Sequence, residues 1–268
     1  MARSSRRAQR KQNSDLMMLI GACLAAIGIL AGAGYFYLTR EKGIDKITLC
    51  PANGPTGHVV LLVDQTDPLN FVQKRAFEAE LQNIVLRRTP KGSLLSVYVL
   101  GEDFTSTAEP LVELCNPGSG EDKSALNSNL VRLRKQYEER FVQPLLQQSE
   151  KLVAATPAKK SPIFEMLQLV GINAFRKHDI QGERRLIVVS DMLHNTAEFS
   201  MYKGLPDFEA FSASDYGRKA QVDLSGVQVE LDYLINDPKL QSRRNLSFWE
   251  AYFNKAHARL VSVRPLEG

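Results

Sequence analysis

Cysteine and histidine, which build most zinc sites and many nucleophilic active sites, are scarce in this chain. Its 268 residues include three cysteines and four histidines. The cysteines form no CxxC pair and the histidines no HExxH pair, so the usual spacings of zinc ligands are absent. No GxGxxG or Walker A loop is present either. The sequence therefore carries no signature of a zinc centre, a histidine-based triad or a nucleotide site.

Excess positive charge is confined to the N-terminus. The chain has 34 basic and 30 acidic residues, and five of the basic ones lie close to its start: Arg3, Arg6, Arg7, Arg10 and Lys11. Without these five, 29 basic residues face 30 acidic ones. Because a nucleic-acid-binding domain normally carries a basic patch in its folded part, we do not expect nucleic acid as a partner.

Residues 16–38 contain no charged side chain. At about 1.5 Å of rise per residue, a helix of this length crosses roughly 30 Å of hydrocarbon. We therefore predict one transmembrane helix here, behind a basic tail at residues 1–15. Five basic residues precede it and fewer follow soon after, so the positive-inside rule places the N-terminus in the cytoplasm. The C-terminal domain is then periplasmic or extracellular, most simply at a bacterial inner membrane.

Two features of this segment leave alternatives open. Ala31-Gly32-Ala33 resembles a signal-peptide cleavage site, although the apolar stretch exceeds the usual core of about 7–15 residues. Gly28 and Gly32 form a GxxxG pair, which would let two membrane helices approach closely and form a homodimer. Glycine is common in membrane helices, so the oligomeric state stays open.

After a connector at residues 39–57, apolar runs alternate with amphipathic segments. We predict strands at 58–64, 94–100, 111–115, 185–190, 227–234 and 259–263. Helices are predicted at 68–88, 163–175 and 246–258, and residues 124–155 form two helices or one kinked at Pro144. This alternation predicts an α/β domain over residues 58–268, with a doubly wound, mostly parallel sheet flanked by helices.

The segment 192–221 mixes aromatic residues with glycine and proline and is predicted to be irregular. Long loops without secondary structure are often functional, so it forms part of a partner-binding surface or folds over the core. His194, which lies within it, is expected to be an exposed loop residue.

Two of the three cysteines lie in the exterior domain. Cys23 falls in the predicted membrane helix, whereas Cys50 and Cys115 lie beyond it. An oxidising compartment favours a disulfide between Cys50 and Cys115, and two separate buried thiols are the alternative. If the third strand runs antiparallel to the first, Cys115 comes to the sheet edge where the first strand starts, next to Cys50.

Four oxygen-bearing side chains lie where α/β sheets bind ligands. Asp64 and Thr66 follow the first strand, Ser161 opens a helix and Asp191 follows the strand at 185–190. Ligands bind beyond the carboxyl ends of the strands, so we predict that these residues converge. Carboxylate and hydroxyl oxygens suit Mg²⁺. Taken singly, each residue would more simply cap a strand-to-helix turn.

These motifs resemble the von Willebrand factor A domain. They are Asp-Gln-Thr after the first strand, the later Ser-Pro-Ile-Phe-Glu-Met-Leu, and an apolar strand ending in Ser-Asp. By resemblance, Asp64 and Thr66 match the family's Asp-x-Ser-x-Ser, Ser161 stands for its Thr, and Asp191 for its final Asp. Pro68 occupies a position where the family expects a hydroxyl, so this metal-ion-dependent adhesion site is partly degenerate.

The resemblance covers roughly residues 58–263 and implies a protein-binding domain rather than an enzyme. We expect a membrane-anchored scaffold or adaptor in an envelope-associated assembly, with Mg²⁺ as its cofactor. The enzymatic alternative is a metal-dependent phosphohydrolase of haloacid-dehalogenase type, in which Asp64 would attack phosphorus. Met192 follows Asp191 where such an enzyme has a second acid.

Overall fold

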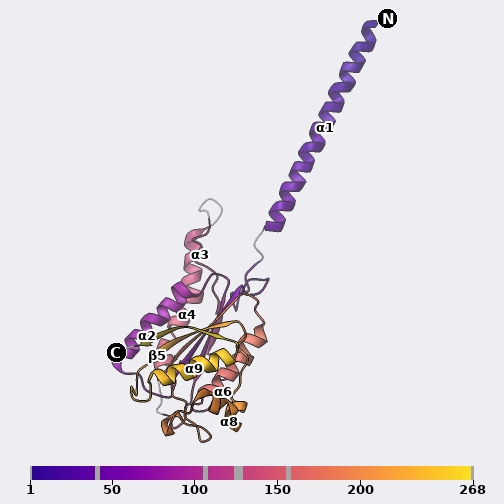
Figure 1. Cartoon of the computed structure of the whole chain (residues 1–268). Coiled ribbons are helices and arrows are strands. Elements are labelled where there is room, and N and C mark those ends of the chain that lie inside the picture. The colour runs from indigo at the N-terminus through magenta and orange to yellow at the C-terminus, as the bar shows by residue number, and fades with distance from the viewer. Residues whose placement is uncertain (1, 40–42, 105–107, 124–128, 155–157, 267–268) are drawn as a thin grey trace. The chain divides into compact units, whose positions relative to one another are not determined.

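The chain folds into two units in a computed structural model, which describes residues 2–39, 43–104, 108–123, 129–154 and 158–266 (Figure 1). The first unit, Met1–Gly43, holds helix α1 (Ala2–Thr39), and the second, Ile44–Gly268, holds every named strand. No helix in the described part of the chain combines the length and apolar character that membrane crossing requires. The transmembrane helix predicted at residues 16–38 gains no support there and stays a prediction.

The second unit is built on one six-stranded sheet. Its strands are β1 (Gly57–Asp64), β2 (Leu94–Leu100), β3 (Val112–Cys115), β4 (Glu183–Ser190), β5 (Val227–Leu234) and β6 (Arg259–Leu266). Their order in the sheet is β3-β2-β1-β4-β5-β6. Only β3 is antiparallel to its neighbour, and the other pairs are parallel. The predicted α/β class is confirmed, and each predicted strand is present.

Helical segments connect these strands. Between β1 and β2 lie α2 (Phe71–Asn83) and η1 (Ile84–Arg88). The longer connection from β3 to β4 contains α3 (Leu130–Tyr137), η2 (Glu138–Val142), α4 (Gln143–Leu146), α5 (Ser149–Val153), α6 (Ile163–Val170) and η3 (Gly171–Arg176). Helix α9 (Arg243–Lys255) joins β5 to β6. Pro144 lies in the first turn of α4, where its missing N–H costs little, so the helical path continues through it.

The prediction that residues 192–221 are irregular is partly wrong. It contains three short helices: η4 (Met201–Lys203), α7 (Phe208–Ala213) and α8 (Asp215–Lys219). Helices of three to six residues are too short to show a helical repeat in the sequence. Phe211 and Met201 are buried, and Phe199 and Phe208 pack on the same cluster. The segment therefore folds over the core.

Two apolar layers enclose the sheet, and β1 contributes to both. Val60 and Leu62 pack with side chains of α6, η3 and α9, whereas Leu61 and Val63 pack with side chains of α2 and α4. All eight residues of β1 are buried. Burial on both faces is why β1 is a continuous apolar run instead of an alternating pattern.

The predicted disulfide is confirmed. Cys50 and Cys115 are bonded, with their Cα atoms 4.7 Å apart. Cys115 ends the antiparallel strand β3, and its N–H donates to the Thr48 carbonyl at 2.8 Å. Leu94 and Ile180 pack around the pair. The cross-link therefore joins the segment that enters the unit to the edge of the sheet.

Candidate functional site

The candidate site lies where the connections of the sheet change direction. Neighbouring strands β1 and β4 occupy the centre, but β1 leads to β2 on one side and β4 leads to β5 on the other. Such a switch point leaves a crevice beyond the carboxyl ends of the two strands, where open α/β sheets bind ligands. Asp64 is the last residue of β1, and Asp191 follows the last residue of β4.

Hydroxyl groups from three segments converge on the Asp64 carboxylate. Its Oδ1 accepts hydrogen bonds from Thr66 N at 2.9 Å and Thr66 Oγ1 at 2.6 Å. Its Oδ2 accepts from Ser190 Oγ at 2.7 Å and, at the limit of hydrogen bonding, from Ser161 Oγ at 3.5 Å. These hydrogen bonds join three of the four predicted residues, and Asp191 lies near enough for the charge of Asp64 to act on it. The structure adds Ser190, whose place at the end of an apolar strand was the only signal in the sequence.

The Asp191 carboxylate is held by the loops that follow β4 and β5. Its Oδ1 accepts from Leu193 N at 2.9 Å, and its Oδ2 accepts from Asn236 Nδ2 at 3.4 Å. The residue after it, Met192, has a positive φ of 56°, which is strained for a residue with a side chain. Trp249 Nε1 donates to the Met192 carbonyl at 2.8 Å and fixes this turn. Buried Trp249 thereby helps to aim Asp191.

Burial and neighbouring negative charge raise the proton affinity of both carboxylates. Asp64 is 5% exposed and Asp191 is 2% exposed. Burial raises the pKa of Asp64 despite the hydrogen bonds from Thr66 and Ser190. Burial, and then the charge of Asp64, raise the pKa of Asp191 well above its ordinary value. Within the described residues, neither carboxylate forms an ion pair with a basic side chain.

A divalent cation fits this donor set electrostatically. Two buried acids without a basic partner repel each other when both are ionised, and a bound cation removes that repulsion. The nearby hydroxyls of Thr66 and Ser161 add neutral oxygen donors of the kind Mg²⁺ accepts alongside water. No cluster of three or more His, Cys, Asp or Glu side chains in the described segments is arranged to hold a metal. The candidate is therefore limited to two carboxylates with hydroxyls.

His194 is buried, and the expectation that it is exposed is wrong. Its side chain is fully buried beside the Phe164 ring, with the ring centroids 4.7 Å apart. Its Nε2 lies 2.9 Å from the Tyr216 hydroxyl, which donates to Glu165 Oε1 at 2.7 Å. Burial lowers the pKa of His194 to about 3. The ring is neutral at physiological pH and packs as part of the core.

Replacing His194 with phenylalanine should flatten the dependence of stability on pH. Between the unfolded pKa of 6.5 and the folded pKa of about 3, the unfolded chain binds the extra proton, so stability falls as the pH drops through this window. Urea unfolding at several pH values should show a slope smaller by about one proton in His194→Phe. Identical slopes would mean that His194 titrates alike in both states. Burial also lowers the pKa of His58 to about 3. Because His58 is present in both proteins, its contribution cancels in the comparison.

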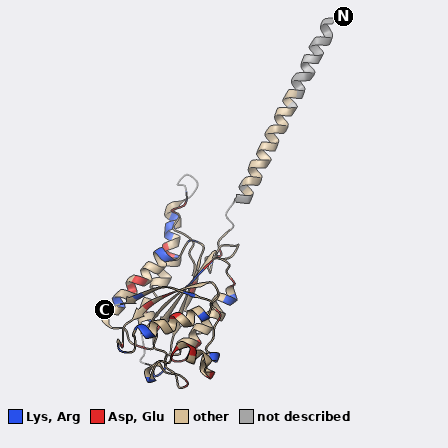
Figure 2. Cartoon of the chain, viewed as in Figure 1, with Lys and Arg blue, Asp and Glu red and all other residues tan. Residues whose placement is uncertain are grey.

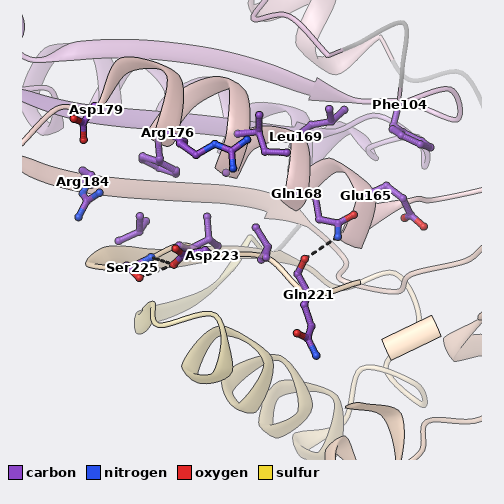
Figure 3. Close-up of a pocket in the computed structure, with 16 residues that line it drawn as sticks. Phe104, Glu165, Gln168, Leu169, Arg176, Asp179, Arg184, Gln221, Asp223 and Ser225 are labelled. Carbon is purple, nitrogen blue, oxygen red and sulfur yellow. Dashed lines mark hydrogen bonds between the residues drawn. The ribbon is translucent and has the colours of Figure 1, made fainter. Parts of the chain in front are cut away.

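A surface groove of about 560 Å³ lies away from these carboxylates (Figure 3). It runs between α6–η3 and the segment 221–227, where Gln168 Nε2 donates to the Gln221 carbonyl at 2.8 Å. Its lining includes none of the four predicted site residues, and its charged groups are of both signs. We therefore place the candidate site at the carboxylates and not in the groove.

No family model matches the chain, and no curated protein does. Solved structures similar to it include proximal thread matrix protein 1 from the mussel byssus, at 12% identity and TM-score 0.39 over 80% of this chain and 45% of that one. The VWA domain of SpRpn10 gives 8% identity and TM-score 0.38 over 79% of this chain and 89% of that one. An aerotolerance-related membrane protein from Bacteroides fragilis gives 11% identity and TM-score 0.32 over 80% and 92%.

This chain thus spans less than half of the mussel protein. With TM-scores below 0.5, these likenesses establish neither a family nor a function for it.

Proposed function

We propose that this chain is a single-pass membrane protein whose α/β unit binds another protein, as a von Willebrand factor A-like scaffold or adaptor in an envelope-associated assembly. The docking site is the cluster of Asp64, Thr66, Ser161 and Asp191. One observation carries the proposal: two buried carboxylates meet at the switch point of the sheet without a basic partner among the described residues. A partner that brings or shares a cation relieves the repulsion between them.

Mg²⁺ is the cation that we propose for this site. Asp64 and Asp191 would supply charge, and Thr66 and Ser161 would supply hydroxyl oxygens. When bound, Mg²⁺ keeps several waters, one of which an oxygen from the partner can replace. Pro68 is exposed and offers no hydroxyl, so the protein contributes fewer ligands than the family's pattern provides. We therefore expect weak, reversible binding.

The phosphohydrolase alternative is not favoured. A nucleophilic aspartate must be reached by a phosphoryl group, which is much larger than a cation. Asp64 is almost fully buried, with Thr66 and Ser190 packed against its oxygens. Met192 follows Asp191 at the position where a haloacid-dehalogenase-type enzyme needs a second acid. The proposed role is therefore binding without catalysis.

The proposed anchor is the uncharged stretch at residues 16–38, with the N-terminus in the cytoplasm. Large apolar side chains in α1 are exposed, among them Leu24, Ile27 and Leu30 at 64%, 61% and 71%. Covering them in lipid or against another helix stabilises the chain. The Cys50–Cys115 disulfide supports a periplasmic or extracellular place for the second unit, because such bonds persist in oxidising compartments. Gly28 and Gly32 would permit a homodimer through α1.

Capture of partners from detergent-solubilised membranes, with Mg²⁺ or with a chelator, tests this function. The full chain serves as bait, and mass spectrometry quantifies what it retains. We expect a specific partner to be retained with Mg²⁺ and reduced at least tenfold by the chelator or by Asp64→Ala. Asp215→Ala is the matched control, because that carboxylate is 92% exposed and pairs at the surface with Arg218. A partner indifferent to chelator and to Asp64→Ala would show that the carboxylates play no part in docking.

A further inference from the structure

Helix α3 is an exposed basic element that the proposed docking site does not use. None of its eight residues is buried. Arg132, Arg134 and Lys135 give it three positive charges, and it contains no acid. Figure 2 shows these basic residues in blue along α3. Acidic residues flank the helix: Glu139 lies 3.7 Å from Lys135, and Glu121 and Asp122 line the same surface hollow as Arg134.

Apolar side chains accompany these charges at the same end of the unit. Leu133 faces inward, because a Cβ on Gly120 would lie 3.1 Å from it. Val131, by contrast, is 81% exposed, and Ile47 in the entering segment is 84% exposed. Exposed apolar groups beside basic ones are typical of surfaces that lie in the headgroup region of a membrane.

The entering segment and the helical run that begins with α3 are in contact. The Arg140 guanidinium, in the turn after α3, donates to the Lys46 carbonyl. Only residues 40–43 separate Thr39, at the end of α1, from Ile44, where the second unit begins. Thr39 and Ile44 are five Cα steps apart and so lie at most about 18 Å from each other. If residues 16–38 cross a membrane, this end of the unit must stay near its surface.

We infer that α3 and the entering segment form a membrane-contact surface that rests on anionic phospholipid headgroups of the bilayer holding the anchor. The inference depends on the proposed anchor. Arg132, Arg134 and Lys46 meet the lipid phosphates, and Val131 and Ile47 enter the boundary with the acyl chains. The contact fixes the orientation of the unit, so that the carboxylate site at the opposite ends of the strands faces away from the membrane.

Hydrogen exchange on the full chain in lipid nanodiscs tests this surface. We expect amides at residues 129–137 to exchange about tenfold more slowly in discs containing phosphatidylglycerol than in phosphatidylcholine discs. The double variant Arg132→Glu/Arg134→Glu should lose this protection, and 1 M salt should also abolish it. The variant should fold, since Arg132 and Arg134 are both exposed and the inward-facing Leu133 is kept.

Lys239→Glu/Arg243→Glu is the matched control, with the same charge change on exposed residues around the start of α9. It should keep the protection of residues 129–137. Equal exchange in the two kinds of disc, fast or slow, overturns the membrane-contact surface but leaves the proposed anchor intact. A chain that enters neither disc overturns both.

Discussion

Replacing Asp64 with alanine should remove Mg²⁺ binding from the second unit and leave its fold intact. Asp64 is the centre of the candidate site, since Thr66, Ser190 and Ser161 all donate to it. Losing one of only two charged ligands should weaken affinity by at least about 100-fold, which is beyond the effect of disturbing a supporting residue. Calorimetric titration of residues 44–268, which contain every named strand and both apolar layers, measures this.

The same variant should alter the stability of the metal-free unit in a defined direction. The folded pKa values of Asp64 and Asp191 lie above the ordinary value of 3.8. The folded state therefore holds protons longer than the unfolded state, and stability declines as the pH rises above 3.8. Asp64→Ala removes one of these groups and the charge that raises the other.

The metal-free variant should consequently gain stability relative to the wild type as the pH rises above 3.8. Urea unfolding in chelator gives the comparison, with Asp215→Ala as the control for removing an exposed acid outside the site. Unchanged Mg²⁺ affinity in Asp64→Ala would contradict the assignment of the site, whatever its stability.

Removing the disulfide should lower the stability of the second unit more than any other substitution proposed for it. Cys50 and Cys115 are 65 positions apart, and closing a loop of this length restricts the unfolded chain. In the chain-entropy model, Cys50→Ala/Cys115→Ala lowers the free energy of unfolding by about 4 kcal/mol. The substitutions also remove Cys115 packing against Leu94 and Ile180.

Urea unfolding of the oxidised wild type and the double variant gives this difference. Cys23→Ala is the control, because Cys23 is free and lies in the other unit. A difference below about 1 kcal/mol would show that the unfolded chain is already restricted in this region.

The sheet was predictable because burial leaves a direct trace in the residue pattern. A strand covered on both faces, such as β1, must be apolar at nearly every position. The carboxyl ends of such strands are then known, which is why Asp64 and Asp191 could be named. The end of the antiparallel third strand placed Cys115 next to Cys50 in the same way.

Other features depended on contacts that leave no local pattern. Ser190 occupies an ordinary strand end, and only the neighbouring β1 brings its hydroxyl to Asp64. His194 became a core residue because the rings of Phe199, before η4, and Tyr216, in α8, pack against it. Helices α7 and α8 are too short to show a helical repeat in the sequence, and tertiary packing stabilises them.

The position of the disulfide determines how the second unit would bear mechanical tension. If a partner binds at the proposed site, its pull would enter at the carboxyl end of β1 and leave through the chain at Ile44, which precedes the amino end of β1. Strand β1 is then loaded in shear between parallel neighbours β2 and β4, an arrangement in which many backbone hydrogen bonds resist together. The covalent clamp from Cys50 to Cys115 carries part of the load to β3 before it reaches β1. Under tension, residues 44–49 can unfold, and unfolding then stops at the Cys50–Cys115 disulfide. The unit therefore extends by a few residues before its sheet is strained.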